Sequence, residues 1–227
     1  MQNLTTNDKK GFTFRVFTLN VPKNRVITLN EVTMKKKILV ILGHPSKESL
    51  NGALANAYYE GAKGNAEVKI LNLGDIRFDP ILWDGYNKRQ ELEPDLIEAQ
   101  ELIKWANHLV IFYPTWWSTI PALLKGFFDR ILLPDFAFSF SSSKKNSPHK
   151  KLLKGRTAHL ITTMDTPSWY YRCIMKQPGF VQLKKGILGF VGIKVVRISS
   201  FIQPSFSTKE KRNKWLTKAL NLGKLNA

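Results

Sequence analysis

The chain has 227 residues, of which 43% are hydrophobic and 23% charged, as expected for a globular domain with a sizeable core. Its formal net charge of +18 favours anionic partners without distinguishing nucleic acid, an anionic membrane surface or a phosphorylated cofactor. The lone Cys173 excludes an internal disulfide, and no run of about 18 apolar residues or signal-peptide core occurs, so we expect a cytoplasmic protein without stable membrane insertion.

The first 33 residues show neither a helical period nor a convincing hairpin pattern. At Met34 the character changes, because three lysines lead directly into an apolar run. We therefore expect residues 1–33 to be a disordered leader or the product of a mis-assigned start. The folded catalytic unit is predicted over residues 34–206, followed by a basic surface helix within 207–227.

Apolar runs and amphipathic periods alternate along the rest of the chain. Buried strands are predicted over residues 38–42, 68–73, 108–113, 157–163 and 193–198. Helices are predicted over residues 50–62, 94–105, 121–133, 181–189 and 208–221, with Ser49 and Ser207 as caps of the first and last. This order predicts an α/β fold, a flavodoxin-like doubly wound five-stranded parallel sheet in a three-layer sandwich.

The connections between these elements differ in character. Residues 75–90 and 164–179 are long loops rich in aromatic residues, and residues 136–138 suit a short strand. The run from Lys144 to Arg156 is strongly basic, and its Ser, Asn and Pro content predicts a solvated loop.

Two adjacent tryptophans, Trp116 and Trp117, follow the third predicted strand directly. Open α/β sheets bind ligands at the carboxyl ends of their strands, so this pair could form a wall for a flat aromatic ligand. Buried aromatic clusters are also common, and simple packing explains the pair equally well at this point.

Three segments together resemble one family. They are GHPSKESLN at residues 43–51, FYPTWWSTIPALLKGFFDRIL at residues 112–132 and LITTMDTPSWYY at residues 160–171. They resemble the flavin-dependent NAD(P)H:quinone oxidoreductases of flavodoxin-like fold, over about residues 35–200. Met164 and Asp165 stand where better-known members carry glycines, and this departure is similar to a bacterial NAD(P)H dehydrogenase (quinone) subgroup.

The resemblance implies a flavin site, for FMN or FAD, built from all three segments. Residues at the start of the first helix would bind its phosphate, where the helix dipole favours an anion: His44, Ser46, Lys47, Ser49 and Asn51. Beside the ring would lie Pro114, Thr115, Trp116 and Trp117, with Thr162, Thr163, Met164 and Asp165 at its polar edge. Tyr170 or Tyr171 would lie near the point of hydride transfer. A plainer interpretation makes Ser49 and Asn51 helix caps and the tyrosines loop packing.

The implied activity is ping-pong transfer of two electrons from NADPH or NADH to a quinone or similar acceptor. The resemblance also implies a homodimer, with residues 75–90 and 164–179 suited to complete sites at its interface. We expect no metal site, since no cluster of ligands has metal spacing, and no nucleic-acid binding. The alternatives are an ancillary or regulatory subunit of a potassium-efflux system, and a basic nucleic-acid-binding protein.

Overall fold

The computed structural model describes residues 35–140 and 149–226. The expected leader, the expected start at Met34 and the basic pair Lys144 and Lys145 lie outside these ranges. Within them, no helix combines the length and apolarity that crossing a bilayer requires.

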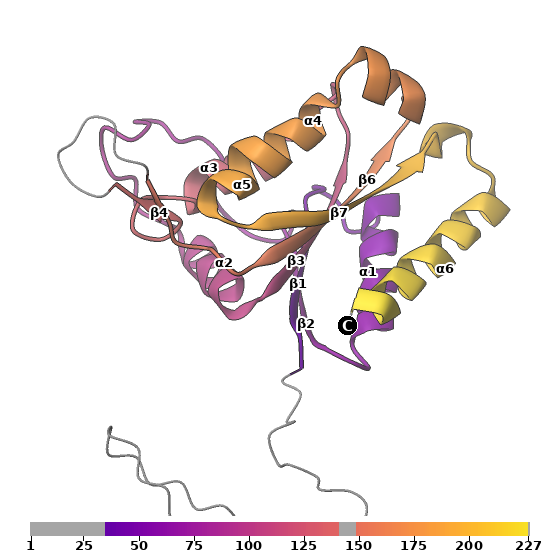
Figure 1. Cartoon of the computed structure of the whole chain (residues 1–227), viewed down its shortest axis with the longest axis horizontal. Coiled ribbons are helices and arrows are strands. Elements are labelled where there is room, and N and C mark those ends of the chain that lie inside the picture. Colours follow the sequence, from indigo (N-terminus) through magenta and orange to yellow (C-terminus); the bar gives the residue numbers. More distant parts are fainter. Residues whose placement is uncertain (1–34, 141–148, 227) are drawn as a thin grey trace, which may run out of the picture. The chain divides into compact units, whose positions relative to one another are not determined.

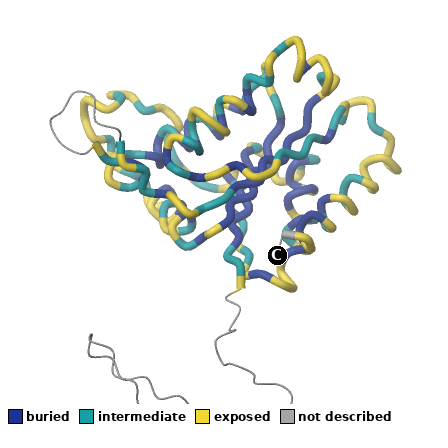
Figure 2. Tube along the Cα trace, in the orientation of Figure 1, coloured by how far each residue is buried: buried dark blue, intermediate teal, exposed yellow. Residues whose placement is uncertain are grey.

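Five parallel strands form the central sheet: β1 (Lys37–Leu42), β2 (Glu67–Asn72), β3 (His108–Pro114), β6 (Thr157–Met164) and β7 (Lys194–Ile202). Their spatial order is β2-β1-β3-β6-β7, so the chain reverses direction across the sheet after β2. This is the doubly wound, flavodoxin-like order predicted from the sequence, and the prediction is confirmed. The strands of the sheet centre are buried along most of their length (Figure 2).

Helices cover both faces of the sheet and make three layers (Figure 1). One face carries α1 (Leu50–Ala62) and α6 (Lys209–Asn226), and the other carries α2 (Pro94–Trp105), α3 (Ala122–Ile131) and the segment from α4 (Pro178–Val181) to α5 (Leu188–Val191). Each face has its own apolar core. Buried Tyr58 and Phe112 lie in the first core, and buried Phe127 and Leu160 lie in the second.

The last helix is longer and better packed than the sequence indicates. It runs to Asn226 and buries Ala219 and Leu222 against the α1 side of the sheet. Its cap is Thr208, whose hydroxyl accepts from the Lys211 amide at 3.2 Å, and not the predicted Ser207. The Ser207 hydroxyl instead donates to the carbonyl oxygen of Pro204, in the 3-10 turn Pro204–Phe206.

Several boundaries also shift. The helix predicted from residue 181 begins at Pro178, because proline suits a first helical position where an amide hydrogen has no partner. Between α4 and α5 the helix widens into a π-helical stretch, Gln182–Ile187. Another π-helical turn, Tyr170–Ile174, lies inside the predicted loop 164–179. The short strands β4 (Phe138–Ser139) and β5 (Lys150–Lys151) pair antiparallel, so part of the basic run is a strand.

A buried arginine, Arg130, fixes the loop between β2 and α2, and we call its set of contacts the Arg130 clamp. The Arg130 side chain on α3 is 1% exposed and forms a double contact with Glu93, with Nη2 to Oε2 at 2.8 Å and Nη1 to Oε1 at 3.2 Å. It also donates to the main-chain carbonyls of Glu91, at 2.8 Å, and Asp79. Charge-assisted bonds of this kind are strong, and here they hold both ends of the loop against α3.

The pKa of Glu93 is lowered overall. Partial burial raises it, but the hydrogen bond from the Asp79 amide and the pairing with Arg130 outweigh that effect. A carboxyl whose folded pKa is lowered stabilises the fold above its unfolded pKa, about 4.5, and this contribution is lost as pH falls below that value.

Replacing Arg130 by Met is expected to lower the free energy of unfolding by roughly 3 kcal/mol at pH 7, because Glu93 and two carbonyls lose their donor. The measurement is urea unfolding. The control is Lys125→Met on the same helix, which breaks a half-exposed ion pair with Asp129 and should cost less than about 0.5 kcal/mol. If the two variants lose the same free energy of unfolding, Arg130 does not hold the loop as described. The same conclusion would follow if the difference between them were as large at pH 3 as at pH 7.

Candidate functional site

The three segments singled out in the sequence meet at one edge of the sheet. β1, β3 and β6 are adjacent and parallel, and Leu42 is in register with Phe112, and Pro114 with Thr163. The loops that follow these strands, beginning at Gly43, Thr115 and Asp165, therefore emerge side by side. Pro114 itself is the buried last residue of β3.

Hydrogen bonds join these segments through the threonine pair. The Asn51 amide Nδ2 donates to the Thr163 hydroxyl at 2.9 Å, and the Thr115 amide donates to the Thr163 carbonyl at 2.8 Å. The Thr162 and Thr115 hydroxyls lie 2.8 Å apart. Either hydroxyl can donate in that pair, and the Thr162 hydroxyl also lies 3.2 Å from the Thr163 carbonyl oxygen. The helix start and the tryptophan loop are thus both tied to the end of β6.

The start of α1 has the properties of an anion site. Ser49 caps the helix, its hydroxyl accepting from the Gly52 amide at 3.2 Å as the sequence predicts. The first turn contains no acidic residue that would compete with a bound anion for the helix dipole. Ser46 and Lys47 are exposed beside it, although the Lys47 ammonium lies 3.4 Å from Asp75.

His44 connects this helix start to the tryptophan loop. Its ring packs edge-on against Trp116, with centroids 5.6 Å apart, and its Nδ1 lies 2.9 Å from both the amide nitrogen and the carbonyl oxygen of Ser46. Partial burial lowers the pKa of His44, and the contact with the Ser46 main chain offsets this only in part. The imidazole is therefore mainly neutral at pH 7 and serves here as a hydrogen-bonding and packing group.

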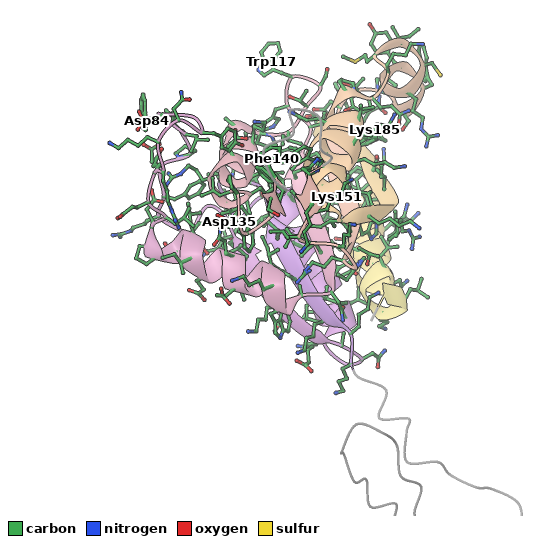
Figure 3. All side chains as sticks on the ribbon, turned by 60° about the vertical axis from the view of Figure 1, so that its left-hand side comes forward. Asp84, Trp117, Asp135, Phe140, Lys151 and Lys185 are labelled. Carbon is green, nitrogen blue, oxygen red and sulfur yellow. The ribbon has the colours of Figure 1, made fainter. Side chains whose placement is uncertain are left out.

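The two tryptophans are held by a tight turn. Trp116 and Thr119 exchange two main-chain hydrogen bonds, at 3.0 and 3.1 Å. The two residues between them, Trp117 and Ser118, have φ angles of 49° and 65°. A turn with two left-handed central residues ordinarily uses Asn and Gly, so a bulky Trp there is strained. Trp117 is 98% exposed and projects from the molecule (Figure 3). Packing within the described chain therefore does not account for the strained backbone at this residue.

Tyr171 anchors this turn from the opposite loop. Its hydroxyl donates to the Ser118 carbonyl at 2.9 Å and accepts from the Gly179 amide at 3.0 Å, and its side chain is 1% exposed. A side chain at residue 179 would meet this hydroxyl at 2.9 Å, which accounts for glycine there. Burial raises the pKa of Tyr171, and the hydrogen bonds from Gly179 and Phe180 oppose this. Tyr170, by contrast, is 41% exposed.

Met164 and Asp165, the two residues after the threonine pair, make different contacts. Met164 is 3% exposed and packs against Tyr171 and Phe180, so its side chain faces the protein interior. The Asp165 carboxylate accepts from the amide and the hydroxyl of Ser205, at 3.0 and 2.7 Å. Both side chains thereby fix neighbouring segments, and the Met164 carbonyl accepts from the Gln203 amide at 2.7 Å.

The residues of this edge fit a flavin. Asn51 is 4% exposed, and its Oδ1 has no hydrogen-bond partner among the residues that the structure describes. The neighbouring Thr163 hydroxyl accepts from Asn51 but donates to none of these residues. A buried free acceptor beside a free donor suits the polar edge of a flavin ring, which carries both kinds of group. The start of α1 would take the phosphate, and Trp116 and Trp117 would flank the ring.

The contacts through Ser118, Gly179 and Ser205 were not anticipated from the sequence. Ser118 and Gly179 take part through main-chain atoms, and Ser205 lies far from Asp165 along the chain, so no sequence motif marks them. Among the described residues, no group of three or more His, Cys, Asp and Glu side chains is placed to hold a metal ion.

Comparison with known proteins identifies the family to which this fold belongs. The family model described as the flavodoxin-like fold matches residues 36–221. The chain belongs to this family. The human ribosyldihydronicotinamide dehydrogenase [quinone] is 26% identical over 202 residues, which cover 78% of this chain and 86% of that protein.

Two solved structures are also similar to this chain. Smu.1420 of Streptococcus mutans is 30% identical, with a TM-score of 0.70 over 83% of this chain and 99% of that one. The FMN-dependent NADH-azoreductase of Bacillus anthracis, solved in complex with FMN, is 22% identical with a TM-score of 0.60 over 85% and 99% of the chains, and it shows the shared fold alone.

Removing the Tyr171 hydroxyl is expected to loosen the tryptophan turn. In Tyr171→Phe the Ser118 carbonyl loses its donor, which should cost about 1–2 kcal/mol of unfolding free energy. It should also speed amide hydrogen exchange in a peptide covering residues 115–121. Tyr170→Phe is the control, because an exposed hydroxyl should contribute less than about 0.5 kcal/mol. If the two variants exchange at the same rate, the anchoring role is wrong.

Proposed function

We propose that this protein is a flavin-dependent oxidoreductase that passes two electrons from NADPH or NADH to a quinone or similar acceptor. The observation that carries the proposal is the convergence at one sheet edge of a helix whose first turn has no acidic residue, an exposed tryptophan turn and a threonine pair. The similarity to a protein named as a quinone dehydrogenase supports the same activity. A flavin, when bound, would supply the hydride and electron chemistry.

The chain's own residues would bind, orient and shield the reactants. The start of α1 and Lys47 would hold the phosphate, while Asn51 and Thr163 would fix the polar edge of the ring. Trp117 would provide one wall of a stacking site that NAD(P)H and the acceptor use in turn, as ping-pong kinetics require. Because Tyr171 is enclosed and uses its hydroxyl to anchor the turn, Tyr170 is the tyrosine proposed to contact the substrate.

The proposed homodimer is supported by exposed apolar residues outside the three segments of the site. Trp83 and Tyr86, in the loop clamped by Arg130, are 69% and 67% exposed, and Phe140 is 71% exposed. Tyr86 and Phe140 also line a pocket of about 490 Å³ with residues of α3 and α5. Large exposed apolar areas of this kind mark interaction surfaces, and a second copy of the chain is the proposed partner.

The decisive experiment is spectroscopic. The purified protein is expected to be yellow. It should lose the visible absorbance of oxidised flavin when NADPH is added and regain it when menadione is added. Chromatography of the released cofactor distinguishes FMN from FAD, and the same preparation should sediment as a dimer. A colourless protein that takes up neither flavin would overturn the proposal.

Replacing Trp117 by Ala is expected to weaken flavin binding or turnover about tenfold, because an aromatic stacking surface is lost. The unfolding free energy should barely change, since the side chain is 98% exposed and its turn is strained. Trp117→Phe keeps an aromatic ring at the same φ angle and should retain most of the affinity. Unchanged binding and kinetics in Trp117→Ala would remove this residue from the site.

A further inference from the structure

A second concave site lies on the side of the molecule formed by β5, α5 and the start of β7. We call it the lysine pocket, and it has a volume of about 440 Å³. Four lysines line it, namely Lys151, Lys154, Lys184 and Lys194, together with Gly189, Gly192, Ile193 and Val195. Lys154, Lys184 and Lys194 are exposed, and Lys151 is half-buried.

Within the part of the chain that the structure describes, no ion pair compensates the charge of the lysine pocket. No acidic residue lines it, and none of its four lysines forms an ion pair within residues 35–140 and 149–226. The sequence itself contains a single acidic residue, Asp165, between Asp135 and Glu210, and Asp165 is bound to Ser205. Clustered like charges repel and destabilise a compact state, so a bound anion would relieve this repulsion.

The main chain positions two of these lysines, Lys151 and Lys154. The Lys151 ammonium donates to the Gly189 carbonyl at 2.6 Å, which directs its charge towards the end of α5. Gly192 has a φ angle of +99°, and a Cβ atom there would lie 2.9 Å from Lys154 Cγ and 3.1 Å from Lys151 Cβ. Glycine thus both ends α5 and leaves room for two lysine side chains to approach.

The lysine pocket is separate from the proposed flavin site. It contains the first residue of β7, Lys194, which is in register with Thr157 at the start of β6. The threonine pair stands at the other end of β6, roughly 20 Å away at 3.3 Å per residue. Figure 3 shows Lys151 well apart from the projecting Trp117. A flavin phosphate at the start of α1 would therefore not reach these lysines.

We infer that the lysine pocket binds an oligophosphate group, two or more linked phosphates carried by a nucleotide or by inorganic polyphosphate. Four lysines lining an open hollow larger than one phosphate match a ligand whose negative charges are spread along a chain. Lysine is a point-charge donor with rotatable hydrogens, which suits phosphate oxygens that present no single fixed geometry. This site does not depend on the flavin chemistry proposed above.

The test is calorimetric titration of the protein as purified, whether or not it carries flavin, with tripolyphosphate. We expect saturable binding that weakens with salt, and a dissociation constant at least roughly tenfold higher in the Lys154→Gln/Lys184→Gln variant, which loses two charged donors. The matched control, Lys214→Gln/Lys224→Gln, removes the same charge from exposed positions on α6 and should stay within about twofold of wild type. Equal unfolding midpoints establish that both variants are folded.

The remaining titrations identify the source of the phosphates. ATP binding more tightly than tripolyphosphate, with the same loss in Lys154→Gln/Lys184→Gln, assigns a nucleotide, and equal affinities assign the phosphate chain alone. Orthophosphate binding as tightly as tripolyphosphate overturns the inference. So does an equal loss in the α6 control, which would mean that binding follows net charge and not this pocket.

Discussion

Thr163 is the residue on which the arrangement of the candidate site depends. Its hydroxyl accepts from Asn51 and its carbonyl accepts from the Thr115 amide, so one residue at the end of β6 joins the α1 start and the tryptophan loop. The parallel register of β1, β3 and β6 brings these segments to the same edge, but it does not fix their separation. The hydrogen bonds do, and they lie among buried groups where such bonds are costly to break.

Much of the fold follows from the sequence because its signals are local. Buried apolar runs and helical periods fix the order of elements, and a parallel sheet covered on both faces is then the natural arrangement. The errors fall where the local signal is weak. β7 continues through Ser199 and Ser200, which lie on an edge strand and are half-exposed, so no apolar run marks them. The π-helical turn at Tyr170–Ile174 has no sequence period of its own.

The candidate site was predictable as a set of segments and less so as a set of roles. The resemblance brings His44, the tryptophans and the threonine pair together, whereas the work of each side chain depends on contacts between distant residues. Asn51 and Thr163 are 112 residues apart, and Tyr171 and Ser118 are 53 apart. Sequence reasoning left Tyr170 and Tyr171 equivalent. Their difference in burial separates them, because one is enclosed by the turn that it anchors and the other faces solvent.

The Arg130 clamp has a consequence for how this protein can change. It holds the β2–α2 loop through Glu93 and through the carbonyls of Asp79 and Glu91, which every amino acid supplies. Of the exposed residues between these anchor points, Tyr86 makes no hydrogen bond to the Arg130 network, whereas the Trp83 indole Nε1 donates to the Asp79 carboxylate at 2.6 Å. Tyr86 can therefore be exchanged while the loop keeps its path, and exchange of Trp83 costs this hydrogen bond. The loop is a natural position at which to vary a library of variants for altered partner or substrate preference without unfolding the domain.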